Sequence, residues 1–208
     1  MKTLKIFNTN NTAFVIGNGK SREGFDLNSL RPYGTIFGCN ALYREFEPDY
    51  LVAIDPPIID EIKQSSFPQD RFIVPKEEEQ FENPEYNPFT RWRSNAGMNA
   101  IIEAIRKNNT NIYLLGFDFI LANDLAVQNI YDGTDCYGPE TRSNMTDNFN
   151  RAKYLNWFVN KFAPNVKYTM ILPRLENLKI QPINGNNVEG VFIDNLMTHL
   201  KNTVKQAA

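Results

Sequence analysis

Three apolar runs in this chain each stop at a glycine with a polar residue close behind it. The first run ends at Gly17-Asn18, the second at Gly38-Cys39-Asn40 and the third at Gly116-Phe117-Asp118. Continuous apolar runs of this length are typical of strands buried on both faces of a parallel sheet. In such sheets the residues that follow the strands meet at the carboxyl edge, where ligands bind. The pattern therefore predicts an α/β domain that binds a nucleotide at that edge.

The rest of the chain repeats this alternation of short strands and longer helical stretches. Helical periodicity begins after Asn95 and again after Asp147, and a third amphipathic stretch, around Leu196, ends the chain. Strands interleaved with helices imply right-handed crossovers and a parallel sheet. We expect a single Rossmann-like α/β domain with a mostly parallel sheet flanked by helices. Its expected strands are 13–17, 35–39, 50–54, 71–74, 111–115 and 166–172.

The length of 208 residues predicts one domain, 1–208, with two unusual connections. Residues 75–93 are acidic, aromatic and proline-rich, and residues 121–145 carry Tyr131, Tyr137 and Arg142. Connections this long in a compact domain are usually functional loops or disordered insertions. Their aromatic content favours lids that cover the expected crevice.

Charge and cysteine content exclude several classes of function. The net charge of -2 lacks the basic surface of a nucleic-acid binder, and no apolar stretch reaches the length of a membrane span. The two cysteines, Cys39 and Cys136, match neither a metal-binding spacing nor a disulfide framework. Free thiols indicate a reducing, cytoplasmic location. The sequence leaves open whether the chain forms a homo-oligomer.

The first glycine loop matches neither of the two best-known phosphate-binding motifs. If Gly19-Lys20-Ser21 were the end of a Walker A loop, its first glycine would fall at position 14. That position is Phe14, inside the expected strand. Gly17 and Gly19 begin a dinucleotide fingerprint, but Arg22 stands at the third glycine position. The expectation that remains is a close backbone approach to the ligand, with Ser21 capping a helix that binds an anion. A plain tight turn is the alternative.

Two further polar residues follow neighbouring strands. Asn40 and Asp55 come at the ends of the second and third expected strands. A carboxamide there can bind a base or a ribose, and a carboxylate can bind ribose hydroxyls or Mg²⁺. Each residue taken alone is as well explained as a helix cap or a turn former.

These motifs, taken in order, resemble a known group of proteins. Residues 15–21, 38–40, 93–98 and 112–119 are similar to the bacterial CMP-sialic-acid-dependent sialyltransferases of glycosyltransferase family 42. They also resemble the related DUF115 proteins, which include motility accessory factors and a hydroxymethylpterin pyrophosphokinase. The resemblance covers about residues 13–173, and each motif alone is weak.

The resemblance implies a Rossmann-like sheet that holds a nucleotide-activated sugar donor. The loop at Gly17 and the asparagine after Cys39 would surround the ribose and phosphate, and the turn at Asn95 would approach from the other side. Together with the glycines and Asp55, the expected nucleotide-binding residues are Gly17, Asn18, Gly19, Ser21, Asn40, Asp55, Ser94, Asn95 and Gly116.

The chain departs from the sialyltransferases at the catalytic base. That family uses a histidine in the lid, whereas the single histidine here is His199, in the C-terminal stretch. Arg142 stands at the corresponding position, where it can hold a phosphate or carboxylate but cannot accept a proton. We therefore expect Asp118, Asp132 or Asp135 to serve as the base, with a pKa raised by burial.

Three functions follow from these expectations. The leading hypothesis is a glycosyltransferase that uses a nucleotide-sugar donor and an unknown acceptor, with no metal ion required. The alternative enzyme is a phosphoryl transferase of the pyrophosphokinase type, with Mg²⁺ held by Asp55 and Asp118. The third hypothesis is a nucleotide-binding module without catalysis. The sequence leaves the nucleotide base, the sugar and the acceptor open.

Overall fold

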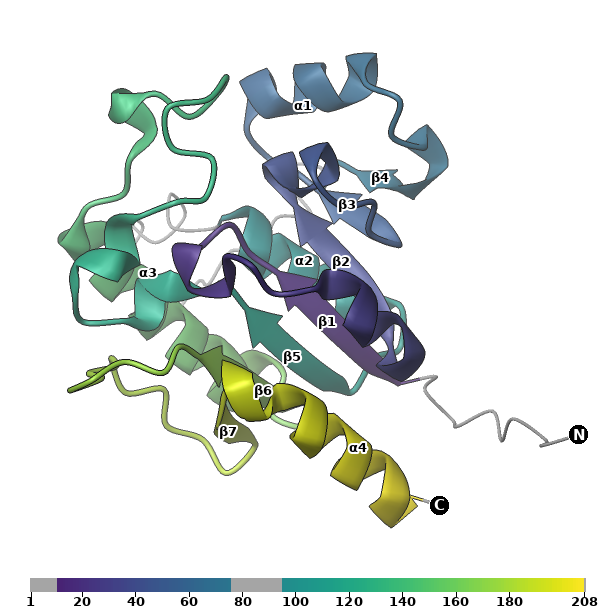
Figure 1. Ribbon diagram of the computed structural model, residues 1–208, viewed down its shortest axis with the longest axis vertical. Coiled ribbons are helices and arrows are strands. Elements are labelled where there is room, and N and C mark those ends of the chain that lie inside the picture. Colours follow the sequence, from purple (N-terminus) through teal and green to yellow (C-terminus); the bar gives the residue numbers. More distant parts are fainter. Residues whose placement is uncertain (1–10, 76–94, 208) are drawn as a thin grey trace, which may run out of the picture.

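The computed structural model describes residues 11–75 and 95–207. Seven parallel strands form one sheet in the order β4-β3-β2-β1-β5-β6-β7, with helices on both faces (Figure 1). The predicted Rossmann-like α/β fold is confirmed. The strands are β1 (Thr12–Ile16), β2 (Thr35–Cys39), β3 (Tyr50–Val52), β4 (Phe72–Ile73), β5 (Asn111–Leu115), β6 (Lys167–Leu172) and β7 (Val188–Phe192).

Two hydrophobic cores lie on opposite faces of the sheet because successive side chains of a strand point to opposite sides. Ala13 and Val15 of β1 pack with α2 (Ala96–Arg106) and α3 (Met145–Trp157), which a π-helical turn, Phe158–Phe162, extends. Phe14 and Ile16 face the other core. That core includes α1 (Pro56–Gln64), α4 (Leu196–Ala207) and the 3-10 helix η2 (Leu27–Tyr33).

All six predicted strands are present, and the sequence missed one strand and one helix. β7 is partly exposed along its length and contains Gly190, so it lacks the apolar run of a buried strand. α1 has only nine residues and begins with Pro56 and Pro57, which look like a turn in the sequence. The predicted helix starts are close to the observed ones: Asn95 is the N-cap of α2, where its Oδ1 accepts the Met98 N–H at 2.9 Å, and α3 begins after Asn144, three residues before Asp147.

The strand order reverses between β1 and β5, and the loops after these two strands contact each other directly. Gly17 N–H donates to Leu115 O at 2.8 Å, and Gly19 N–H donates to Gly116 O at 3.0 Å. A Cβ atom would lie 2.5 Å from Gly116 O at position 17 and 2.6 Å from it at position 19. Both glycines are therefore required by the approach of one loop to the other.

Arg22 secures this contact from a buried position. Its side chain is 3% exposed, and its Nε donates to Gly17 O at 2.7 Å. Its Nη2 pairs with Glu45 at 2.9 Å and donates to Tyr131 Oη at 3.2 Å. The residue that breaks the dinucleotide fingerprint thus joins the β1 loop to two distant segments.

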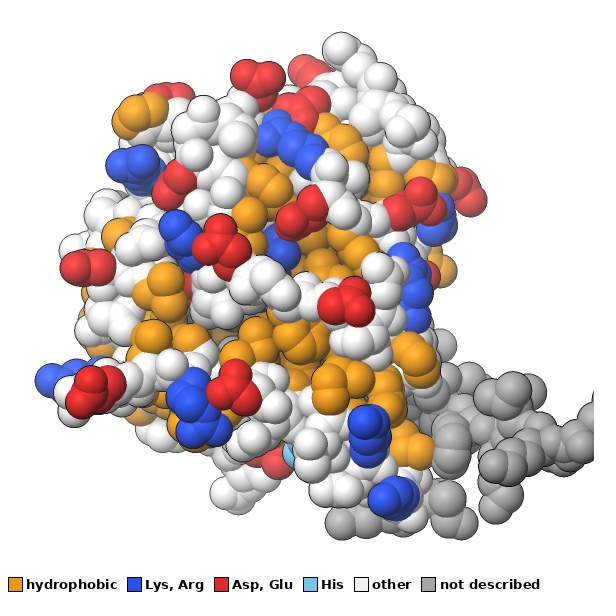
Figure 2. All heavy atoms as spheres, viewed as in Figure 1, with side chains coloured by type: hydrophobic (Ala, Val, Ile, Leu, Met, Phe, Trp, Pro, Cys, Tyr) orange, Lys and Arg blue, Asp and Glu red, His pale blue; other side chains and the backbone are white. Residues whose placement is uncertain are grey.

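The face in front of the sheet is covered thinly. Short 3-10 helices cover part of it: η1 (Lys20–Arg22), η2 and η3 (Asn40–Arg44). The helix α4 lies beside them (Figure 1). Figure 2 shows apolar side chains between the charged ones on this face. Among the described residues, none of the helices combines the length and the apolar character needed to cross a membrane.

We predict that Arg22→Met lowers the free energy of unfolding by about 2 kcal/mol, because three hydrogen bonds from a buried cation are lost. Arg31→Met is the matched control. Arg31 pairs with Asp49 at 3.5 Å and donates to Asn28 Oδ1 at 3.2 Å and to Glu47 O at 2.7 Å, all at the exposed surface, so its loss should cost under about 1 kcal/mol. Urea unfolding of both variants measures the difference. Equal effects would show that Arg22 does not hold the loops together.

Candidate active site

A cavity of about 570 Å³ opens at the carboxyl edge of the sheet. Its floor comes from the loops after β1, β2, β3 and β5, and its walls come from the N-terminus of α2, the segment 121–145 and α3. This volume suits a nucleotide-sized ligand. Eight of the predicted site residues line it: Gly17, Asn18, Gly19, Asn40, Asp55, Asn95, Gly116 and Asp118.

The glycine loop does not form the predicted anion site at a helix N-terminus. The turn that follows it, η1, is a 3-10 helix of three residues. Asp118 fills the space beside Gly19, where a Cβ atom would lie 2.4 Å from the carboxyl carbon. Ser21 caps no helix: its N–H donates to Asp118 Oδ2 at 2.8 Å, and its hydroxyl donates to Oδ1. Ser21 therefore lies behind Asp118 and outside the cavity wall.

These contacts and the burial of the side chain affect the pKa of the Asp118 carboxyl. It is 5% exposed, and burial raises its pKa, while the two hydrogen bonds from Ser21 and the charge of Arg22 oppose that rise. The prediction that burial raises the pKa of this candidate base agrees with the structure. Since both oxygens already accept hydrogen bonds, the carboxylate is also a structural link between the β1 and β5 loops.

Two residues that line the cavity, Asn18 and Asn40, each carry a buried side-chain oxygen without a hydrogen-bond donor among the described residues. Asn18 Oδ1 and Asn40 Oδ1 are buried and accept no hydrogen bond from any residue that the structure describes. They follow the adjacent strands β1 and β2. The backbone of Asn40 is in the left-handed region, with a φ of 50°, which costs energy for any residue but glycine and is least costly for asparagine and aspartate. Asn40 thus combines an unsatisfied buried oxygen with a backbone conformation that few residue types adopt at low cost.

Asp55 and Arg151 place opposite charges on the wall. Asp55 is the N-cap residue of α1, but its side chain makes no capping hydrogen bond. It stays accessible from the cavity; burial of the surrounding site raises its pKa, and the charge of Arg151 partly opposes that rise. Arg151 Nη1 donates to Asn148 Oδ1 at 3.0 Å and to Ser143 Oγ. Asn148 in turn donates to Ala126 O at 2.6 Å. The position of Arg151 is therefore fixed jointly by α3 and by the segment 121–145.

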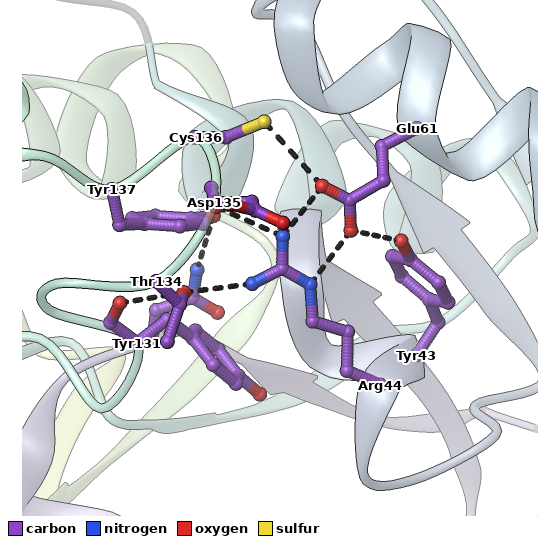
Figure 3. A network of polar contacts seen from close by, with 9 residues as sticks. Tyr43, Arg44, Glu61, Tyr131, Thr134, Asp135, Cys136 and Tyr137 are labelled. Carbon is purple, nitrogen blue, oxygen red and sulfur yellow. Dashed lines mark hydrogen bonds and ion pairs between the residues drawn. The ribbon is translucent and has the colours of Figure 1, made fainter.

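A polar network anchors the segment 121–145 beside the cavity (Figure 3). Arg44 of η3 donates to both oxygens of Glu61 on α1, at 2.7 and 2.6 Å. Arg44 also donates to Thr134 Oγ1 at 2.8 Å and to Asp135 O at 2.9 Å. The Cys136 thiol donates to Glu61 Oε2 at 3.4 Å. The Arg44–Glu61 ion pair thus joins η3 to α1, and the hydrogen bonds with Thr134, Asp135 and Cys136 attach the segment to this pair, in addition to the bond from Arg22 to Tyr131.

The other predicted catalytic residues lie away from the cavity wall. Asp132 accepts the Asn129 N–H at 3.2 Å and lies 3.8 Å from Arg142, whose side chain is 56% exposed. Asp135 is exposed and contributes its backbone carbonyl to Arg44. The structure does not bring these three residues to Asp118. Ser94 and most of the predicted lid 75–93 lie outside the described residues.

His199 also lies outside the cavity wall, on α4. Its Nε2 is 3.3 Å from Tyr113 Oη and 3.6 Å from Glu189. The polar wall residues that sequence reasoning missed come from α3 and the segment before it. Asn148 and Arg151 stand three positions apart, which places them on one face of α3, and this spacing was the available signal. The missed polar residues are Gln128, Asn129, Thr141, Ser143, Asn148 and Arg151.

No group of three or more metal-ligating side chains occurs within 11–75 and 95–207. Comparisons with protein-family models, curated proteins and solved structures found no match.

We predict that Ser21→Ala lowers the free energy of unfolding by about 1.5 to 3 kcal/mol at pH 7, because the Asp118 carboxylate loses a hydrogen bond. Its pKa rises further, so the folded state holds the proton more tightly. The loss should therefore shrink as the pH falls toward 4 and vanish once the carboxyl is protonated in the folded and unfolded states.

Ser29→Ala is the matched control, because the Ser29 hydroxyl donates to a neutral backbone carbonyl, Asp26 O, at 2.6 Å. Its cost should not change with pH. Thermal unfolding between pH 3.5 and 8 measures both variants. A loss in Ser21→Ala that stays constant over this range would show that the charged form of Asp118 does not depend on Ser21.

Proposed function

We propose that this chain is a transferase that binds a nucleotide-activated sugar in the carboxyl-edge cavity. The observation that carries the proposal is the pair of buried, unsatisfied oxygens of Asn18 and Asn40, at the ends of two adjacent strands. A buried acceptor without a donor costs about 1 to 3 kcal/mol, which a ligand hydroxyl or amino group would recover. Nucleotides carry such groups on both the ribose and the base.

The character of the wall favours a sugar nucleotide over a free polyphosphate. Six carboxamide side chains line the cavity, whereas Arg151 is the one arginine or lysine of the described residues that does so. Carboxamides bind hydroxyl groups and base edges by paired hydrogen bonds. The amides of Gly17 and Gly19, which would hold phosphate in a dinucleotide fold, donate to carbonyl groups of the β5 loop.

In this proposal Asp55 replaces the missing histidine as the general base. Its carboxylate is accessible and its raised pKa makes it a stronger base, while Asp118 is buried and bonded twice to Ser21. It would remove the proton from the attacking hydroxyl of the acceptor. The oxygen would then bond to the anomeric carbon as the bond to the nucleotide phosphate breaks. Arg151 would stabilise the charge on the departing phosphate.

The alternative is a Mg²⁺-dependent phosphoryl transferase, for which Asp55 is the accessible carboxylate; Asp118, the second ligand expected from the sequence, has both oxygens bonded to Ser21. The two readings differ in their response to chelation. Titration with CMP, CDP, UDP, GDP and ATP, each with Mg²⁺ and with excess EDTA, separates them. The transferase proposal predicts that a nucleotide other than ATP binds equally well in EDTA. Binding that requires Mg²⁺ would support the alternative. If none of the five nucleotides binds, both readings are contradicted.

We predict that Asn40→Gly weakens the binding of that nucleotide about ten- to a hundredfold, because the buried carboxamide contact is lost. Glycine takes the positive φ without strain, so the backbone of the loop should persist. Asn108→Gly is the matched control, since Asn108 has a φ of 64°, is exposed and does not line the cavity. Calorimetry measures both. Equal affinities in the two variants would exclude Asn40 from the site.

A further inference from the structure

The hydroxyl of Tyr137 lies between the two asparagines that carry the unsatisfied oxygens. Asn18 Nδ2 donates to Tyr137 Oη at 3.1 Å. Tyr137 is 9% exposed, and burial raises its pKa, while hydrogen bonds from the Ala41 backbone and the Asn40 side chain oppose that rise. A direct hydrogen bond thus joins the Asn18 carboxamide, after β1, to the phenol oxygen of Tyr137 in the segment 121–145, and the Asn40 side chain, after β2, lies within the electrostatic reach of the same oxygen.

This arrangement sets the direction of both carboxamides. An asparagine side chain has its N–H₂ group on one side and its oxygen on the other. Because Nδ2 of Asn18 faces Tyr137 Oη, Oδ1 of Asn18 faces away from it, and the same direction holds for Asn40 when its N–H₂ group faces the phenol. Both oxygens are buried without a donor from the described residues, as expected if they are held for a ligand.

Tyr137 is itself held in place by the network in Figure 3. The guanidinium carbon of Arg44 lies 5.8 Å from the centre of the Tyr137 ring, within reach of a cation–π interaction. Glu61 fixes this guanidinium with two hydrogen bonds. The Tyr131 ring packs against Tyr137 with a centroid distance of 5.7 Å. The position of the phenol oxygen therefore depends on α1, η3 and the segment 121–145 together.

We propose that Tyr137 is a positioning residue that directs the oxygens of Asn18 and Asn40 at two hydrogen-bond donors of the ligand. The proposal rests on the proposed function for the presence of a nucleotide in the cavity. Two parts of a nucleotide offer such donors: the ribose hydroxyl groups, or the amino group of the base. Both make the same kind of hydrogen bond to a carboxamide oxygen.

Tyr137→Phe tests the proposal because it removes the oxygen and keeps the ring. Tyr131→Phe is the matched control: the Tyr131 hydroxyl donates to Glu45 at 2.6 Å, accepts from Arg22 at 3.2 Å and contacts neither asparagine, so its loss removes an anchor of the segment without touching the two carboxamides. The first readout needs no ligand. The side-chain ¹⁵N–H₂ resonances of Asn18 and Asn40, assigned in the full chain, should move in Tyr137→Phe and stay in place in Tyr131→Phe. Unmoved resonances in Tyr137→Phe would overturn the positioning role.

The second readout is the affinity for CMP, UMP and 2′-deoxy-CMP. We expect Tyr137→Phe to bind CMP at least about tenfold more weakly than Tyr131→Phe does, with a similar melting temperature. Weaker wild-type binding of 2′-deoxy-CMP than of CMP assigns the donors to the ribose, and weaker binding of UMP assigns them to the base amino group. Equal affinity for all three, or equal CMP affinity in the two variants, would overturn the ligand part of the proposal.

The two readouts separate this proposal from the proposed function. If the wild type binds no nucleotide but the two asparagine resonances move in Tyr137→Phe, the proposed function fails and the orientation of the asparagines by Tyr137 is supported. If nucleotides bind and the resonances do not move, the proposed function stands and the positioning role fails.

Discussion

The direct contact between the loops after β1 and β5 determines how the rest of the site is built. In many parallel α/β sheets the crevice at the point of strand reversal is open to the ligand. Here Gly17 and Gly19 bring one backbone against Gly116, and Asp118 covers Gly19. The crevice between these two loops is therefore closed by backbone hydrogen bonds, and the closed loops form the floor of the cavity. The ligand space lies above it, between the ends of β1, β2 and β3 and the elements α2, α3 and 121–145.

This closed floor changes which groups can recognise a ligand. Two loop amides that could hold a phosphate are bonded to carbonyls instead, and the turn after the loop is too short to form a helix N-terminus. In the proposed function, recognition therefore depends on carboxamides, and Tyr137 positions two of them. The segment 121–145 supplies that phenol and is anchored by Arg22 and Arg44. The orientation of the asparagines thus depends on Tyr137, and the position of Tyr137 depends on the contacts that anchor the segment.

The sequence predicted what depends on local patterns. Buried strands, helix caps and the glycine loop all left periodic or short-range signals, so the fold and eight wall residues could be predicted. The roles of Ser21 and Arg22 could not, because their partners are remote: Asp118 lies 97 positions from Ser21, and Tyr131 lies 109 positions from Arg22. Arg22 reads in the sequence as a missing glycine, and its buried contacts exist only once the chain has folded. The sequence also contains no sign that the candidate bases in 121–145 do not line the cavity, since the direction of a loop side chain has no periodic signal.

The central claim is that a nucleotide occupies this cavity, and the two cysteines on its wall test it directly. Cys39 is 2% exposed and burial raises its pKa to about 12, whereas Cys136 is half-buried and its pKa is also raised, by burial and by the hydrogen bond to Glu61. At mildly alkaline pH a thiol reagent should modify Cys136 in the native protein, and both cysteines only after unfolding. The account predicts that the nucleotide with the highest affinity by calorimetry slows the modification of Cys136 in proportion to its occupancy. A nucleotide that saturates the protein and leaves the rate at Cys136 unchanged would contradict it.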